Sequence, residues 1–245
     1  VYPLAVMFKH TGEKKYLDAS IKLGNWLITQ QEPGGEWLET PWTWTGTTAD
    51  QLLMMSLTFP IVEKYLSDSE KVNWERSIKN AADFLVKNMN PDFATINYCA
   101  TTPASLTTTN LIFPNKVYLE KARKLSRMVL SKMNEEGFIE GEAARVGKVK
   151  YGVDPAYEFD MSFWGLELYA RLTNDTIVHN AIKKALLEHL PLVYPNGVID
   201  GSWGARCYKW TTFGSKTADG SQFFLSLLGK EKRRLQPPQL GNLNN

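Results

Sequence analysis

Three side chains that can hold or transfer protons lie close together in one short stretch of the sequence, namely Tyr157, Glu158 and Asp160. The stretch opens with Asp154 and Pro155, which favour a helix start, because a carboxylate caps free backbone N–H groups and proline lacks an N–H that would go unused there. The apolar residues that follow leave no continuous polar face: Phe159, Met161, Phe163, Trp164, Leu166, Leu168, Tyr169 and Ala170. A helix buried on all sides, with a polar first turn, is typical of the wall of a site.

Two other predicted helix starts carry a polar side chain suited to the same site. Asp50 lies one turn into an apolar helix, so we expect it at the same level as Asp160, where the two carboxylates could serve as acid and base. Asn97 begins a helix rich in small residues, and its amide either binds a substrate carboxylate or caps the helix, the simpler role. His179 and His189 fall on a predicted outer helix, so any base is a carboxylate or a tyrosine.

A third polar group lies near the C-terminal end, in a stretch that glycine and serine keep irregular. Arg206, Tyr208 and Lys209 supply positive charge and a phenol. An arginine can hold a carboxylate through two parallel hydrogen bonds, so basic groups opposite an acidic helix start fit an acidic sugar. The alternative is that these charges pair internally with Glu158 and Asp160.

Aromatic residues gather in the predicted long loops. Five of the eight tryptophans lie there, Trp37, Trp42, Trp44, Trp203 and Trp210, together with Tyr151, Tyr194 and Tyr208. Exposed rings are unfavourable unless they meet a ligand or a partner, and flat apolar faces beside hydrogen-bonding groups suit sugar rings. We therefore predict a sugar-binding groove, and the alternative is that the rings pack a small core of the loops themselves.

Two kinds of predicted helix alternate along the chain. Helices with one apolar face are expected at about 14–31, 70–88, 116–133 and 176–190, and more uniformly apolar helices at about 2–8, 48–65, 98–112, 156–172 and 218–228. The first kind starts every 46 to 60 residues, which is typical of a repeated helical hairpin. Because uniformly apolar helices belong inside and one-faced helices outside, the pattern predicts an all-α fold, an α/α toroid with an inner and an outer ring.

The predicted connections differ in length according to their direction. Inner-to-outer connections are short, whereas the outer-to-inner ones are long and span about 32–47, 90–97, 134–155 and 191–217. The long loops must then emerge on one rim, above the starts of the inner helices, where we expect the function to lie. Four hairpins and one further helix make an incomplete toroid over residues 1–228, and the polar tail 229–245 is expected to be poorly ordered. Short β pieces at 197–199 and 207–213 could form a loop hairpin.

Composition excludes several classes of function. The formal net charge of +2 argues against a nucleic-acid-binding surface, and no apolar run reaches the roughly 20 residues that span a bilayer. Cys99 and Cys207 could form one disulfide, although two buried thiols are the simpler interpretation. Metal-ligand spacing, phosphate loops and nucleophile elbows are absent, so we expect no cofactor. The sequence starts at Val1, without a Met and within a predicted helix, which indicates a processed or partial product.

Three stretches, together with the hairpin period, resemble a known group of domains. They read Gly-Phe-Ile-Glu-Gly-Glu ending at Glu142, Tyr-Gly-Val-Asp-Pro-Ala-Tyr-Glu-Phe-Asp ending at Asp160, and Asp-Gly-Ser-Trp-Gly-Ala-Arg-Cys-Tyr-Lys-Trp ending at Trp210. The resemblance is to the α/α-toroid domains of polysaccharide-utilising bacteria, among them heparinase- and alginate-lyase-like polysaccharide lyases and unsaturated glucuronyl hydrolases. It covers most of residues 1–222.

The resemblance to the lyases implies β-elimination on a uronate sugar. Asn97 and Arg206 would neutralise the C5 carboxylate and so acidify the neighbouring C–H, and Tyr157 or Tyr208 would remove that proton and protonate the leaving oxygen. The remaining expected contacts to a polysaccharide or oligosaccharide come from Glu158, Lys209, Trp42, Trp44, Trp203 and Trp210. Such domains work in the periplasm or outside the cell, which is the location we expect.

Two alternatives stay open. A hydrolase of the unsaturated-uronyl type would use Asp50 and Asp160 as its carboxylates, and a non-catalytic glycan-binding toroid would need only the tryptophans. The sequence departs from the lyases in lacking a loop histidine and the β-sandwich domain that usually follows the toroid. The prediction favours the lyase over the hydrolase by a narrow margin.

Overall fold

The computed structural model describes residues 1–38, 45–142, 145–146, 149–150, 152–194, 200 and 204. Its long helices are α1 (Tyr2–Thr11), α2 (Lys14–Thr29), α3 (Thr48–Val62), α4 (Asp68–Asn88), α5 (Ile96–Ile112), α6 (Lys116–Leu130), α8 (Phe163–Thr173) and α9 (Thr176–His189). Between α6 and α8 lie the antiparallel strands β1 (Arg145–Val146) and β2 (Val149–Lys150), the short helix α7 (Pro155–Tyr157) and the π-helical segment η2 (Glu158–Ser162). Two 3₁₀ turns, η1 (Glu63–Tyr65) and η3 (Leu190–Leu192), follow α3 and α9.

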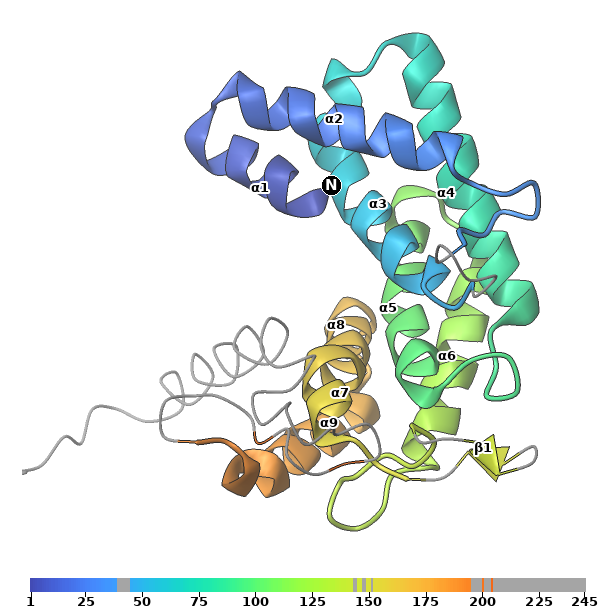
Figure 1. Cartoon of the computed structure of the whole chain (residues 1–245), viewed down its shortest axis with the longest axis vertical. Coiled ribbons are helices and arrows are strands. Elements are labelled where there is room, and N and C mark those ends of the chain that lie inside the picture. Colours follow the sequence, from blue (N-terminus) through green and yellow to red (C-terminus); the bar gives the residue numbers. More distant parts are fainter. Residues whose placement is uncertain are drawn as a thin grey trace, which may run out of the picture.

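The long helices form two layers (Figure 1). An inner layer consists of α1, α3, α5 and α8, each in contact with the next, and an outer layer consists of α2, α4, α6 and α9. Each inner helix also packs against the outer helix that follows it, so the repeating unit is a helical hairpin. The predicted all-α fold of alternating inner and outer helices is confirmed, and within the described chain every predicted helix start lies within two residues of the observed one.

Helix α4 shows why the outer helices form. Ser67 and Glu70 make a reciprocal capping box at its N-terminus, which satisfies backbone N–H groups that the helix cannot. Trp74 and Ile78 are fully buried on the face that covers the inner layer. The same residues tie α4 to the neighbouring outer helix, because Asn25 of α2 donates to Glu70 and accepts from the Trp74 indole, both at 2.7 Å.

Small residues let the inner helices approach one another closely. A Cβ atom on Gly165 of α8 would lie 2.7 Å from the carbonyl oxygen of Ala100 in α5, so only glycine fits this contact. On the other side of α5, the Ser105 hydroxyl donates to the carbonyl of Ala49 in α3 at 2.7 Å. Backbones held this close leave the inner helices little freedom to shift relative to one another.

The inner helices are staggered along their axes. The contact between Ser105 and Ala49 places the first turn of α3 beside the middle of α5. The first turn of α5 lies in turn beside η2, because the Asn97 amide contacts Met161. Ser105 follows Asn97 by eight residues, so the starts of α3 and α5 are offset by about 12 Å at 1.5 Å per residue.

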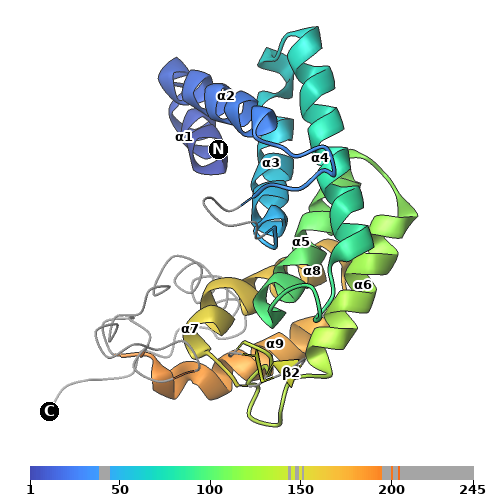
Figure 2. The same cartoon turned by 45° about the vertical axis from the view of Figure 1, so that its right-hand side comes forward.

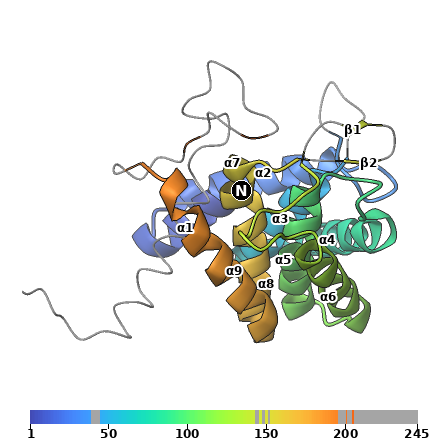
Figure 3. The same cartoon turned by 90° about the horizontal axis from the view of Figure 1, so that it is seen from below.

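The four described hairpins form an open arc, with α1 and α2 at one end and α8 and α9 at the other (Figures 1 and 2). Helices α3, α5 and α7 each begin after a longer connection, and in Figure 3 the strands β1 and β2 and helix α7 lie on the same side of the array. We call this side, formed by residues 30–38, 45–47, 89–95 and 131–154 as far as they are described, the loop rim. The described residues therefore offer a rim rather than the closed central pocket of a full ring.

Several sequence-based predictions concern residues outside the described ranges, namely the β pieces 197–199 and 207–213, the helix 218–228, the tail 229–245 and Cys207. Cys99 is buried, and because Cys207 is not described, the choice between a disulfide and two thiols stays a prediction. The β1–β2 hairpin was not predicted, because two-residue strands leave no alternation to recognise. Across the described part of the chain, no helix combines the length and the apolar character needed to cross a membrane.

Candidate active site

Asn97 lies at the loop rim, in the first turn of α5, and is completely buried. Its side-chain oxygen accepts a hydrogen bond from the Thr95 hydroxyl at 2.6 Å, and its backbone N–H donates to a carboxylate oxygen of Glu142 at 3.2 Å. Helix α5 begins at Ile96, so Thr95 and not Asn97 occupies the N-cap position. The interpretation of Asn97 as a helix cap is therefore wrong, because its side chain is oriented by the rim loops.

The side-chain NH₂ group of Asn97 faces a weak hydrogen-bond acceptor. Its Nδ2 atom lies 3.1 Å from the sulfur of Met161, which is only 8% exposed. A thioether is a weak hydrogen-bond acceptor, whereas a carboxylate is a strong one. A substrate carboxylate that displaced the Met161 side chain would therefore improve the hydrogen bonding of Asn97.

Tyr157 stands in the first turn of the neighbouring inner helix. Asp154 caps this turn by accepting from the Tyr157 backbone N–H at 3.2 Å, and Pro155 occupies the first helical position, as predicted. Tyr157 is half-buried and lies four residues before Met161, so the two share a helix face about one turn apart. The structure thus brings Tyr157 and Asn97 to the same region of the loop rim.

Glu158 is not a rim residue, which corrects its predicted role in substrate binding. Its side chain is 1% exposed, and both oxygens are occupied inside the protein. One accepts from the Ile139 backbone N–H at 3.0 Å, and the other lies 2.7 Å from Nε2 of His189. Burial raises the pKa of the Glu158 carboxyl above its ordinary value, against the opposing effect of His189.

His189 contacts Glu158, the residue that follows Tyr157, and the sequence did not identify it as important. It was set aside because α9 is an outer helix, yet it is completely buried at the end of α9 that reaches the loop rim. Its spacing was the available signal. Ile182, Ala185 and Leu186 form the buried face of α9, and His189 continues that face at the next position of the helical repeat.

The packing contacts place the two aspartates at different levels of the inner layer, and the acid–base pair stays a prediction. Asp160 directly precedes Met161 and so lies near the start of α5, whereas Asp50 lies in the first turn of α3, beside Ser105. The offset of about 12 Å applies to the backbone levels, and glycoside hydrolases hold their two carboxyl groups roughly 5 to 9.5 Å apart, so the stagger makes this pair less favourable. Both aspartates are half-buried.

Most predicted aromatic and basic site residues fall outside the described ranges: Trp42, Trp44, Trp203, Arg206, Tyr208, Lys209 and Trp210. Trp37 can be assessed, and it is 2% exposed, with its indole N–H donating to the Leu27 carbonyl at 2.8 Å. This ring is part of the main hydrophobic core of the helices and not of a separate core of the loops. Tyr194, by contrast, is 41% exposed.

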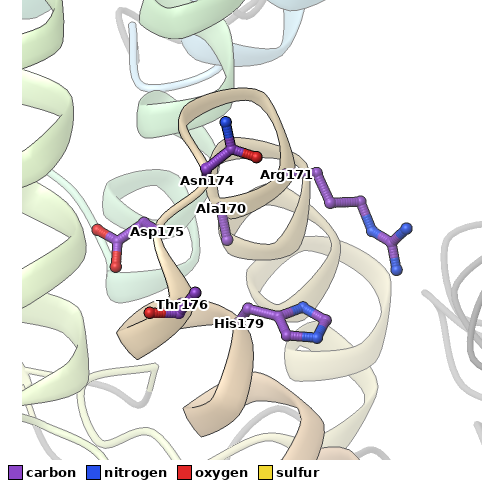
Figure 4. A pocket seen from close by; sticks show the side chains of 6 residues that line it. All are labelled: Ala170, Arg171, Asn174, Asp175, Thr176 and His179. Atoms are coloured by element: carbon purple, nitrogen blue, oxygen red, sulfur yellow. The ribbon is translucent and has the colours of Figure 1, made fainter.

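A surface hollow of about 320 Å³ lies at the turn from α8 into α9, at the far end of α8 from its η2 junction (Figure 4). It is lined by Ala170, Arg171, Asn174, Asp175, Thr176 and His179. The buried carboxylate of Glu167 accepts from Arg171 Nε at 2.6 Å and lies 3.0 Å from His179 Nδ1. These polar contacts connect α8 to α9. We therefore interpret the hollow as part of the packing of the hairpin and not as a ligand site.

Asp175 in this turn predicts an acid-dependent loss of stability. Burial alone would raise the pKa of its carboxyl, but the Val178 N–H and the Arg127 guanidinium outweigh burial and hold that pKa below its ordinary value. The contribution to stability is therefore present at neutral pH and lost as the pH falls through the lowered pKa. We expect Asp175→Asn to cost about 1 kcal/mol at pH 7, since Arg127 is partly exposed, and much less at an acidic pH below the lowered pKa.

Urea denaturation at the two pH values measures this difference. Asp18→Asn, which removes an exposed pair with Lys14, is the control and is expected to change stability little at either pH. An equal loss for Asp175→Asn at both pH values would contradict the prediction.

Comparison with known proteins agrees with the helical architecture. A family model described as the ulvan lyase N-terminal domain matches residues 1–243. A broad-specificity ulvan lyase of Formosa agariphila is 28% identical over 231 residues, which are 91% of this chain and 36% of that protein. A solved structure described as a polysaccharide lyase superposes with a TM-score of 0.57 at 14% identity, over 94% of this chain and 35% of the other.

The chain thus spans about a third of the length of the curated relative that it matches. The structural likeness concerns the fold, and it confirms the predicted resemblance to the helical domains of polysaccharide lyases. The family model covers nearly the whole sequence. This chain belongs to the family of ulvan lyase N-terminal domains.

Proposed function

We propose that this chain is the helical domain of a polysaccharide lyase that cleaves an acidic, uronate-containing polysaccharide by β-elimination. The observation that carries the proposal is the position of Asn97, a buried residue whose NH₂ group lies against a thioether, in the same rim region as the first turn that carries Tyr157. Family membership and the ulvan lyase relative support it. Ulvan is therefore the first substrate to test.

In the proposed reaction, the Asn97 amide binds the carboxylate on C5 of the uronate. This hydrogen bond stabilises the negative charge that develops when the C5 proton leaves, as donors do in other sites that stabilise oxyanions. A tyrosine, Tyr157 or Tyr208, takes that proton. The C5–H electron pair forms the C4–C5 double bond, the C4–O bond breaks, and the tyrosine passes the proton it took to the leaving oxygen. Arg206 shares the neutralisation of the carboxylate.

The two rival functions have less support. A hydrolase built on Asp50 and Asp160 is made less favourable by the stagger of α3 and α5, which keeps the two backbone levels about 12 Å apart. A non-catalytic glycan-binding domain would leave Asn97 and Tyr157 without a task. We further propose that the protein acts in the periplasm or outside the cell, where intact polysaccharides occur, and that it binds glycan rather than nucleic acid.

Absorbance in the ultraviolet, near 235 nm, tests the reaction, because β-elimination creates a C4–C5 double bond conjugated to the carboxylate. The protein is incubated with ulvan, alginate and glycosaminoglycans, and separately with oligosaccharides that already carry the double bond. A rise with a polysaccharide supports the lyase. A fall with the unsaturated oligosaccharides would indicate the hydrolase, and glycan binding without any change in absorbance would indicate a binding domain.

A further inference from the structure

A buried junction lies directly behind the proposed site. The Glu158 carboxylate joins three parts of the chain, because it belongs to η2, accepts from Ile139 in the loop between α6 and α7, and contacts His189 at the end of α9. Glu158 and His189 are 1% and 0% exposed. A polar contact this deeply buried is costly to break, because no water can replace a lost partner.

The hydrogen-bond partners of His189 determine which atoms of the junction carry protons. Nδ1 of His189 lies 2.7 Å from the Ala185 carbonyl oxygen, which can only accept, so Nδ1 carries a hydrogen. Nε2 lies 2.7 Å from the Glu158 carboxylate, and one proton occupies this contact whichever of the two groups holds it. The junction is therefore electrically neutral as a pair, which makes its burial tolerable.

The surroundings of the junction keep its parts in place. Three aromatic rings surround the His189 imidazole, Phe138 with its centroid 4.2 Å away, Phe163 at 5.0 Å and Phe159 at 5.6 Å. The loop also rests directly on α9, because a Cβ atom on Gly137 would lie 2.5 Å from the Ala185 Cα. Neither the imidazole nor the loop has room to move away from Glu158.

We propose that Glu158 is a positioning residue for the rim site, a proposal that rests on the function proposed above. Glu158 follows Tyr157 directly and opens the π-helical segment that also carries Asp160 and Met161. A π-helical segment is rare and is often found at functional sites, since its wider turn redirects the neighbouring side chains. The junction ties this turn to the 137–142 loop and to the end of α9, and so sets where Tyr157 lies relative to Asn97.

The chain offers a matched control in Glu167. This carboxylate is also buried, at 2% exposed, and also pairs with a histidine of α9, His179, but it lies in the middle of α8, about two turns beyond Glu158. Glu158→Ala and Glu167→Ala each remove a buried, histidine-paired carboxylate from the same hairpin. Both are expected to lower stability, but only the first should disturb the rim site.

Glu158→Gln separates position from charge. A glutamine oxygen can accept from Ile139 as the carboxylate does, and its NH₂ group can donate to a neutral His189 Nε2. All the hydrogen bonds of the junction then survive without the shared proton. If Glu158 acts through its position and not through its charge, the Glu158→Gln variant should keep near wild-type activity.

The test compares kcat and KM of the purified whole chain and the three variants on the polysaccharide that the wild type cleaves. We expect Glu158→Ala to lower kcat by about 30- to 100-fold with KM within about threefold, since a displacement near 1 Å costs about that much. Glu158→Gln and Glu167→Ala should stay within about threefold of wild type in kcat. Equal losses for the two alanine variants, no loss for Glu158→Ala, or no rescue by glutamine would each overturn the proposal.

Hydrogen exchange keeps the proposal testable even if the proposed lyase function fails or Glu158→Ala does not fold. Peptides covering residues 137–142 and 155–162 should exchange faster in Glu158→Ala than in wild type, and at wild-type rates in Glu167→Ala and Glu158→Gln. His189→Phe, which keeps a ring in the aromatic enclosure, replaces Glu158→Ala if the latter is unfolded and should show the same faster exchange. Unchanged exchange in these peptides would overturn the proposal without reference to activity.

Discussion

Replacing Tyr157 by phenylalanine is expected to lower kcat on the uronate polysaccharide by about 10²- to 10⁴-fold, the range that a positioned proton-transfer group contributes. The change removes only the phenol oxygen, and the Asp154 cap of this turn involves the Tyr157 backbone, so the helix start should persist. KM should change little, because sugar binding does not depend on this proton transfer. Initial rates of the absorbance rise near 235 nm provide the measurement.

Tyr169→Phe is the control for this variant. The Tyr169 hydroxyl donates to Asp175 at 3.2 Å, at the end of the α8–α9 hairpin away from the loop rim, so its loss should affect stability but not turnover. Full activity in Tyr157→Phe, combined with loss in Tyr208→Phe, would transfer the proton-transfer role to Tyr208. Full activity in both would contradict the tyrosine mechanism.

Replacing Asn97 by alanine is the second large effect that we expect. The amide is proposed to stabilise the charge that develops on the uronate carboxylate, and removing one such donor typically lowers kcat by about 10²- to 10³-fold. Asn97→Asp should be at least as damaging, because it places a carboxylate where the substrate carboxylate binds. Stability should fall only modestly, since the amide N–H of Asn97 is bonded to a thioether.

Asn110→Ala provides the comparison within the same helix. Asn110 lies near the other end of α5 and accepts from the Asn115 backbone N–H at 2.8 Å, so its loss should leave the contacts at the loop rim unchanged. Kinetics of both variants, together with their urea denaturation curves, separate turnover from folding. Asn97→Ala with wild-type kcat would show that the amide takes no part in the reaction.

The helical hairpin architecture followed from the sequence because its signals are local. An apolar stripe or an all-round apolar surface is set by residues three and four apart, and it sorts a helix into the outer or the inner layer. The start of the helix at Pro155 was equally readable, since Asp154 binds the backbone only three residues away. Loop lengths alone then placed the functional rim, because every longer connection enters an inner helix.

The partners of the polar side chains could not be read in the same way. Glu158 resembled an exposed rim carboxylate, but it is paired with His189, which lies 31 residues further along the chain. Asn97 resembled a cap, but it contacts Met161, 64 residues away. No spacing rule connects such residues, because their contact depends on which helices pack side by side.

The sequence by itself thus determined the hairpin repeat, the layer to which each helix belongs and the rim on which the longer loops gather. Only the tertiary structure decided the axial stagger of the inner helices, which separates Asp50 from Asp160 and weakens the hydrolase alternative. The stagger depends on close backbone contacts such as that of Gly165 with Ala100, whose fit is a property of two surfaces together. Periodicity fixes which face of a helix is buried, whereas the packing of small residues against a neighbour fixes how far along that neighbour the helix sits.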